Sequence, residues 1–276
     1  MSSRLEGVTV RFDSTVALHD ITFAAPAGVV SVVVGGDGAG KTTLLGCLTG
    51  AVQTSGGRVE RPAKRLVGVM PSTSGTWRDL TVDENIDFVA KAYGITGDRL
   101  EHKRRELLAK AGLEHARDRL AGQLSGGMRQ KLGFVLAILH DPALLVLDEP
   151  TTGVDPVSRV ELWRLVSEAA AAGAAVAMAT TYLDEAERAS SVLVLDAGHA
   201  LASGTADEVI RSLPGTISAV QRPDDPRRAW RRGRVYHEWH PEGEPGAGQL
   251  DGSADLEDAV IVQMLRRREQ HGSPAP

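Results

Sequence analysis

The sequence predicts an α/β fold with a mostly parallel sheet, and two patterns carry this prediction. Residues 35–43 read Gly-Gly-Asp-Gly-Ala-Gly-Lys-Thr-Thr and lie between an apolar strand at 29–34 and a helix at 41–48. From residue 143 onward, short apolar runs alternate with helical stretches. This alternation is typical of parallel strands whose connecting helices cover both faces of the sheet.

The N-terminal part is predicted to supply an antiparallel β edge and the first strands of the sheet. Strands are expected at residues 8–12, 21–23, 29–34 and 66–70, where apolar and β-branched residues concentrate. A helical insertion is expected at 75–140. Its first helix is expected to begin at Thr81, an N-cap residue with Glu84 three positions later. A charged helix at 101–111 and an apolar helix at 132–139 follow.

The strand pattern returns after this insertion. A continuous apolar run at 143–147 is typical of a fully buried strand. The remaining elements are expected at 156–172 (helix), 174–179 (strand), 183–189 (helix) and 192–195 (strand).

Residues 206–276 are predicted to form a small C-terminal appendage with one flexible loop. Residues 222–254 are rich in Arg, Gly and Pro, and residues 234–240 alternate as a strand does. Five arginines lie between 227 and 234 together with Trp230, and a nucleic-acid-binding patch is one interpretation of this cluster. A solvated strip, or a face that docks on a partner, is the favoured interpretation.

Composition limits the functions that this chain can have. The net charge of −5 gives no general reason to expect nucleic-acid binding. The single cysteine, Cys47, excludes an intrachain disulfide and favours a reduced, cytoplasmic setting. No stretch has the apolar length of a signal peptide or a membrane span, so any link to a membrane is expected through a partner chain.

The run at 35–43 matches the phosphate-binding pattern G-x-x-x-x-G-K-[ST]. Glycines let the backbone curl so that several N–H groups point at one phosphate, Lys41 adds a positive charge, and the Thr42 hydroxyl suits Mg²⁺. An ordinary glycine-rich turn is disfavoured because the strand, the lysine and the threonines are all in place. The predicted nucleotide-binding residues of the loop are Gly35, Gly36, Asp37, Gly38, Ala39, Gly40, Lys41, Thr42 and Thr43.

Two further motifs indicate a family. Leu124-Ser125-Gly126-Gly127-Met128-Arg129-Gln130 precedes the apolar strand that ends in Asp148-Glu149-Pro150. With the phosphate loop, these motifs resemble the ATP-binding cassette (ABC) family, specifically the nucleotide-binding domain of a transporter, over about residues 5–205. The resemblance implies a P-loop NTPase fold of ABC type. Its RecA-like ATP-binding core would comprise residues 1–74 and 141–205, and its helical signature subdomain residues 75–140.

The resemblance also implies that a second cassette is needed. Exposed N–H groups and the helix dipole at the start of the signature helix favour an anion. In the family this anion is the γ-phosphate of ATP held by the other subunit, so two domains sandwich two nucleotides head to tail. The residues implied in this contact are Ser125, Gly126, Gly127, Met128 and Gln130.

Asp148 and Glu149 are the candidate chemical residues at the end of the buried strand. Ligands of such sheets bind at the carboxyl ends of the strands. By resemblance, Asp148 holds Mg²⁺ through water, beside the Thr42 hydroxyl. Glu149 is then the general base, with Lys41 as the second catalytic residue. A simple pair of charges at a strand end is the disfavoured alternative.

Two other positions carry weaker signals. Phe12 is similar in position to the family's adenine-stacking aromatic, with a core residue of the first hairpin as the alternative. Asp155 lies in Gly153-Val154-Asp155-Pro156, which resembles the family's D-loop between subunits; a plain turn before the next helix is the alternative.

The sequence departs from the family at two polar positions. Ser72 stands where relatives carry a glutamine that contacts Mg²⁺ and the attacking water, and Thr181 stands where they carry the switch histidine. Both replacements are shorter than the usual side chain. ATP is therefore expected to bind well but to turn over slowly at this site, since losing one preorganised donor costs on the order of 10²–10³ in rate.

The resemblance implies an ATP-binding subunit that energises an ABC transporter on the cytoplasmic face of the membrane. Its partners would be a multispanning membrane subunit and a second cassette, in a homo- or heterodimer, with ATP and Mg²⁺ as cofactors and no nucleic acid. Export is favoured because residues 182–187 and 255–261 resemble multidrug-type exporters. A non-transport ABC ATPase is disfavoured by the single cassette and the lack of heptads. A regulatory ATP-binding module with little or no turnover is disfavoured by Glu149.

Overall fold

A six-stranded sheet forms the centre of the computed structural model, which describes residues 2–244 and 254–271. The strand order is β5-β6-β7-β3-β8-β9, and every neighbouring pair is parallel except β8 and β9. This confirms the predicted α/β class with its mostly parallel sheet. The strands are β3 (Val30–Val34), β5 (Val67–Met70), β6 (Leu144–Asp148), β7 (Ala175–Thr180), β8 (Ser191–Asp196) and β9 (His199–Gly204).

Both faces of the central sheet are covered, which is why β3, β6 and β7 are apolar along most of their length and buried at every position. Side chains that alternate along each strand enter different cores. Val33, Val146 and Ala177 pack with α1 (Lys41–Thr49) and the N-terminal strands. The residues next to them, such as Val32 and Leu145, pack with the helices on the opposite face.

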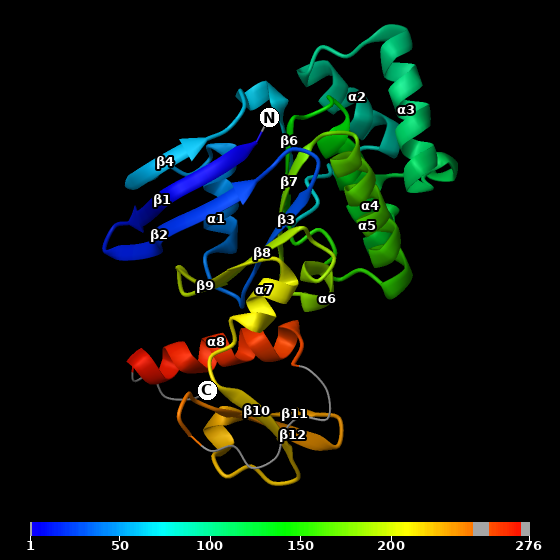
Figure 1. Cartoon of the computed structure of the whole chain (residues 1–276). Coiled ribbons are helices and arrows are strands. Elements are labelled where there is room, and N and C mark those ends of the chain that lie inside the picture. The colour runs from blue at the N-terminus through cyan, green and yellow to red at the C-terminus, as the bar shows by residue number, and fades with distance from the viewer. Residues whose placement is uncertain (1, 245–253, 272–276) are drawn as a thin grey trace.

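The N-terminal strands form a separate antiparallel sheet in the order β2-β1-β4, at the left of Figure 1. They are β1 (Ser3–Phe12), β2 (Thr15–Ala25) and β4 (Gly56–Glu60). The first two strands are longer than predicted. Strand β4 was missed because its sequence, Gly-Gly-Arg-Val-Glu, has low strand propensity and takes its conformation from pairing with β1.

Three α-helices lie between β5 and β6, as the sequence predicts: α2 (Val82–Ala92), α3 (Gly97–Ala111) and α4 (Gly126–Ile138). The predicted capping box is present, with Thr81 accepting from the Glu84 amide and Glu84 accepting from the Thr81 amide. Helix α3 starts earlier than the expected residue 101. Short 3-10 turns lie at η1 (Lys64–Leu66), η2 (Glu114–Ala116) and η3 (Ala121–Gln123).

Helices α5 (Pro156–Ala171) and α6 (Leu183–Ala186) follow the predicted pattern, with one difference in length, whereas α7 (Ala206–Arg211) was not predicted. Helix α5 begins at a proline, and α7 begins with a second capping box. Helix α6 ends at Ala186, so the predicted helix at 183–189 was too long. Hydrogen bonds from Arg188 and Ala189 to carbonyls three residues earlier replace the α-helical pattern there.

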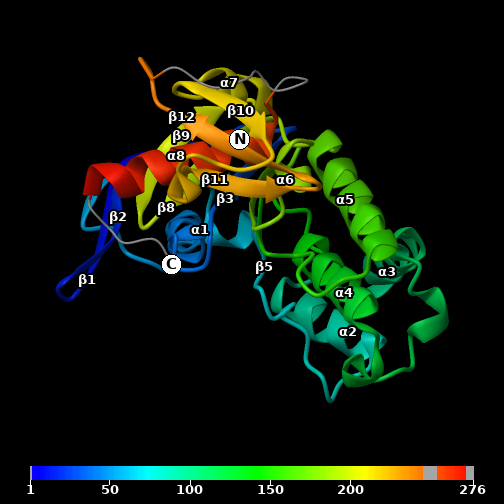
Figure 2. The same cartoon turned by 90° about the horizontal axis from the view of Figure 1, so that it is seen from below.

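The appendage contains a small antiparallel sheet and a helix. Strands β10 (Thr216–Val220), β12 (Val235–His240) and β11 (Ala229–Arg232) pair in that order, with η4 (Pro226–Arg228) before β11. Helix α8 (Leu256–His271) lies between this sheet and the main body in Figure 1, and in Figure 2, seen from below, the strands of the sheet overlap α8. Most of the Gly/Pro-rich stretch 241–252 lies outside the described residues, so the flexible loop stays a prediction.

Helix α8 belongs to two hydrophobic cores at once. Leu256, Ala259 and Val260 pack in the core that covers the central sheet. Val262 packs with Ile217 and Trp239 of the small sheet. Helix α8 therefore connects the appendage to the main body through its packing on both.

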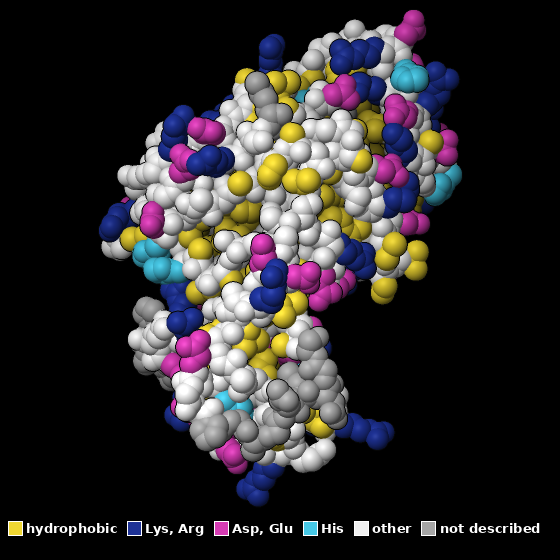
Figure 3. Space-filling model, in the orientation of Figure 1, with side chains coloured by type: hydrophobic (Ala, Val, Ile, Leu, Met, Phe, Trp, Pro, Cys, Tyr) yellow, Lys and Arg dark blue, Asp and Glu magenta, His cyan; other side chains and the backbone are white. Residues whose placement is uncertain are grey.

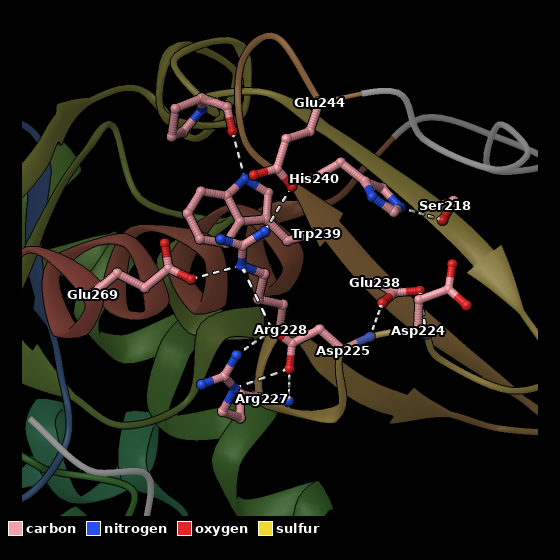
Figure 4. Close-up of polar contacts among 11 residues, drawn as sticks. Ser218, Asp224, Asp225, Arg227, Arg228, Glu238, Trp239, His240, Glu244 and Glu269 are labelled. Carbon is pink, nitrogen blue, oxygen red and sulfur yellow. Dashed lines mark hydrogen bonds and ion pairs between the residues drawn. The ribbon is translucent and has the colours of Figure 1, made fainter.

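Arginines of the predicted basic cluster are tied to acidic side chains of the appendage. Arg228 donates to Glu269 Oε1 at 2.6 Å and to Glu244 Oε2 at 2.7 Å, and Figure 4 shows it among these carboxylates. Arg232 donates to Asp255 Oδ2 at 2.7 Å. On the face drawn in Figure 3, basic and acidic side chains are interspersed. These pairs favour a structural role for the two arginines over a nucleic-acid patch.

Among the described residues, no helix has the length and apolar character needed to cross a membrane.

Gly68 of β5 marks a close approach between the sheet and α4. A Cβ atom there would collide with the carbonyl oxygen of Ala137. We expect Gly68→Ala to lower the free energy of unfolding by about 1–3 kcal/mol, the usual cost of overpacking. Gly56→Ala is the control, because its nearest neighbour would be Thr9 Cβ at 4.0 Å. Denaturant titration of both variants measures the difference, and equal stabilities would contradict the prediction.

Candidate functional site

The loop at 35–40 connects the buried strand β3 to α1, and its glycines are required by shape. Gly38 and Gly40 have φ angles of 76° and 106°, in the region that L side chains rarely adopt. No side chain among the described residues caps the start of α1. Its free N–H groups and helix dipole therefore make the loop suitable for an anion such as a phosphate.

Lys41 is 5% exposed and is held by three partners at this loop. Its Nζ donates to Gly35 O at 2.8 Å and to Gly36 O at 3.1 Å, and it lies 3.2 Å from Glu149 Oε1. The structure thus brings together the two predicted catalytic residues, Lys41 after β3 and Glu149 after β6, which are far apart in the sequence.

The side-chain oxygens of Thr42 and Asp148 lie next to each other near this lysine. Thr42 Oγ1 donates to Asp148 Oδ2 at 3.0 Å. The other oxygen, Asp148 Oδ1, is buried and has no hydrogen-bond partner within the described part of the chain. Burial raises the pKa of Asp148 and the charge of Glu149 adds to the rise, while the Thr42 hydrogen bond opposes it. An unpartnered buried carboxylate oxygen next to a hydroxyl fits Mg²⁺, which prefers oxygen ligands.

Glu149, the residue directly after β6, has an unusual backbone conformation. Its φ of 49° lies in the left-handed region, where a non-glycine residue is uncommon. Its amide donates to Ala179 O at 2.9 Å, and Oε2 accepts from Thr152 Oγ1 at 3.2 Å. Such strain is typical of functional positions.

Lys41, Thr42 and Glu149 line a cavity of about 480 Å³, whereas Asp148 lies behind Thr42 and is not part of its lining. Asp37 to Thr43 and Glu149 line it, together with Thr15, Val16, Ala17, Ala197 and Gly198. Sequence reasoning missed the last five, which belong to no motif and reach the cavity only through the packing of β2 and the β8–β9 turn. Phe12 pairs with Thr15 across the hairpin and is 50% exposed. This exposure contradicts the core alternative, while its stacking role stays a prediction.

The signature residues stand at the start of α4. Ser125 caps the helix by accepting from the Met128 amide at 3.2 Å, and Gln130 is buried. A Cβ on Gly127 would come within 2.6 Å of Ser158 Oγ, so this glycine packs directly on the first turn of α5. None of the described residues that line the 480 Å³ cavity belongs to the signature.

Asp155 is the N-cap of α5. Its Oδ1 accepts from the Ser158 amide at 3.0 Å, and this hydrogen bonding lowers the pKa of Asp155. The capping role accounts for the local turn, and contact with a second cassette stays a prediction. Ser72 lies in the turn after β5 and Thr181 directly after β7; both side chains are exposed. Neither of them is among the described residues that line the cavity.

Comparison with known proteins gives consistent matches. The family model "ABC transporter" matches residues 18–152. The chain is 37% identical to the probable multidrug ABC transporter ATP-binding protein YbhF of Escherichia coli, over 81% of this chain but 41% of that protein. It is 32% identical to the daunorubicin resistance ATP-binding protein DrrA2 of Streptomyces coeruleorubidus, over 98% of this chain and 88% of the relative. A solved ATP-binding subunit of an ABC transporter superposes with a TM-score of 0.70 at 29% identity, covering 76% of this chain and 92% of that one.

Replacing the buried carboxylate should separate stability from metal binding. Asp148→Asn keeps an acceptor for the Thr42 hydroxyl but removes the negative charge of a carboxyl group whose pKa is raised by burial. At pH 7 and without Mg²⁺, we expect Tm to rise by about 2–4 °C, the shift that about 1 kcal/mol produces. We expect Mg²⁺ affinity to fall about 10–100-fold.

The rise in Tm should shrink as the pH falls, because the wild-type carboxyl becomes protonated and its burial then costs less. Thermal unfolding and Mg²⁺ titration measure the two effects, with the exposed Asp118→Asn as control. A lower Tm for Asp148→Asn would show that burial of this charge does not limit stability.

Proposed function

Because this chain belongs to the ABC transporter family, we propose that it is an ATP-binding subunit that energises a transporter, in the direction of export. The observation that carries the proposal is the meeting of Lys41, Asp148 and Glu149 at one phosphate loop. The chain spans 41% of the length of YbhF, so that protein's whole activity is carried over here only as a proposal.

The proposed division of labour follows the geometry of the cavity. Loop N–H groups and Lys41 would hold the phosphates of ATP, and Thr42 with Asp148 would hold Mg²⁺, which neutralises phosphate charge when bound. An ATP phosphate would replace Glu149 as the anionic partner of Lys41. The Glu149 carboxylate would then be free to orient and deprotonate the attacking water.

The proposal includes the three-part division of the chain. Strands of the central sheet come from residues 1–74 and 141–205, which supports a RecA-like core there. Helices α2, α3 and the signature helix α4 support a helical subdomain at 75–140, and residues 206–276 are the appendage. Because the signature lies outside the cavity of its own chain, we propose that it completes the site of a second cassette, in a homo- or heterodimer.

A second surface supports a membrane partner. The exposed apolar side chains Val69, Trp77, Phe88 and Tyr93 surround a groove between β5, α2 and α4. The Trp77 and Phe88 rings lie 4.4 Å apart, so they form one patch. Patches of this kind mark protein–protein contacts. We propose that a multispanning membrane subunit docks here and holds this chain at the cytoplasmic face of the membrane.

The direction of transport rests on resemblance. The relative YbhF is named as a probable multidrug ABC transporter protein, and DrrA2 as a drug resistance protein that covers nearly the whole chain. The 255–261 segment, which resembles multidrug-type exporters, is built into α8 and its cap. These observations favour export over import.

Substitution of the proposed base tests the function. In the assembled complex, Glu149→Gln should lower the ATPase rate by at least about 10²-fold, because an amide cannot accept the proton of the water. ATP binding should persist, and the ATP-bound dimer should accumulate. The exposed Glu168→Gln is the control. Unchanged hydrolysis would exclude Glu149 as the base, and a wild type without any turnover would favour a regulatory ATP-binding module.

Slow turnover is a separate part of the proposal and has its own test. Thr181→His should raise the ATPase rate about 10-fold or more, because it restores a long donor for the γ-phosphate. Thr181→Val, which removes the hydroxyl and adds no donor, should not raise it. If the wild type already runs at roughly 1–10 s⁻¹ and the histidine changes nothing, slow turnover is wrong.

A further inference from the structure

Residues 180–185, which include Thr181, are held in a local turn by hydrogen bonds within the segment. Thr180 Oγ1 donates to Glu185 Oε2 at 2.6 Å, and the Tyr182 amide donates to Thr180 Oγ1 at 3.1 Å. The Glu185 side chain is fully buried, whereas Thr181 between these contacts is exposed. The position of Thr181 therefore depends on what holds residues 180–185 against the rest of the molecule.

Arg159 of α5 contacts three side chains of this segment. Its Nη2 donates to both carboxylate oxygens of Asp184 at 2.9 Å and lies 3.5 Å from Glu185 Oε1. Its guanidinium carbon lies 4.0 Å from the centre of the Tyr182 ring. A planar guanidinium can pair with carboxylates and stack on a ring at the same time, which a lysine ammonium does less well.

The other end of this contact is fixed to the signature helix. Arg159 lies in the first turn of α5, where its amide donates to Asp155 O at 2.9 Å. Gly127 of α4 packs on Ser158 in the same turn. One turn further on, Glu161 of α5 forms an ion pair with Lys131 of α4. The first two turns of α4 and of α5 are thus joined by close packing and by an ion pair.

We propose that Arg159 is a positioning residue that couples the signature helix of this chain to Thr181 of its own ATP site. A shift of the joined ends of α4 and α5, when the signature engages the nucleotide of a second cassette, moves residues 180–185 with it. The coupling matters more here than it would with a histidine, because a threonine hydroxyl has a short reach and must be placed accurately. The inference rests on the proposed function for its catalytic consequence.

Hydrogen exchange tests the contact without any need for hydrolysis. In the full chain without nucleotide, amides of a peptide covering 180–186 should exchange about 10-fold faster in Arg159→Ala and by an intermediate factor in Arg159→Lys. Exchange of the loop at 35–43 should not change. The matched control is Arg164→Ala, an arginine of the same helix whose ion pair is with Glu168.

Unchanged exchange at 180–186 in both Arg159 variants would overturn the proposal. Faster exchange across the whole chain, together with a lower Tm in both variants, would also overturn it, since Arg159 would then be a general stabilising residue. Arg159→Lys keeps the charge and so remains informative if Arg159→Ala fails to fold.

Steady-state ATPase of the assembled complex tests the catalytic consequence. We expect kcat to fall roughly 10–10²-fold in Arg159→Ala, as for other small misplacements of a reacting group, with KM for ATP nearly unchanged. Ser125→Ala should then cost less in the Arg159→Ala background than in the wild type, because the two act through one path. Additive effects, or a change confined to KM, would overturn the coupling. A wild type with no turnover would count against the proposed function, and the exchange result would still decide the contact.

Discussion

Parallel pairing of β6, β7 and β3 is the constraint on which the rest of the site depends. Because these strands are neighbours and run in the same direction, their carboxyl ends meet at one edge of the sheet. The phosphate loop follows β3, Asp148 ends β6 with Glu149 next to it, and Thr180 ends β7. Residues that are far apart in the chain therefore need only continue their own strands to meet, and the buried apolar strands hold their relative positions.

The sequence predicted well those parts of the fold whose signals are local. The glycine run, the capping box at Thr81 and the buried run before Asp148 each contain their own physical reason, and the structure has the corresponding elements. Strands β4 and β11 could not be predicted in this way, because glycines and arginines dominate them and their conformation comes from pairing with β1 and β12. The Lys41–Glu149 contact also required the strand order, which no local pattern contains.

Electrostatics explains why the site and the remainder of the molecule use charge differently. At the phosphate loop, one buried lysine faces two acidic residues, and the Asp148 carboxylate retains a buried oxygen without a partner among the described residues. In the appendage, by contrast, Arg228 and Arg232 are each surrounded by carboxylates. Charges that are paired with each other stabilise a local structure, whereas a buried oxygen that lacks a hydrogen-bond partner can still accept a contact from a ligand.

Helix α8 packs in two hydrophobic cores, and this affects how the protein unfolds. Since Leu256, Ala259 and Val260 belong to the large core and Val262 to the small one, neither core can open at α8 without exposing apolar surface of the other. Among the described residues, the core of the small sheet buries only Ile217, Trp239 and Val262, and so small a core gives little stability by itself. We therefore expect the two parts to unfold as one cooperative unit, so that a substitution that weakens the small core also lowers the stability of the main body.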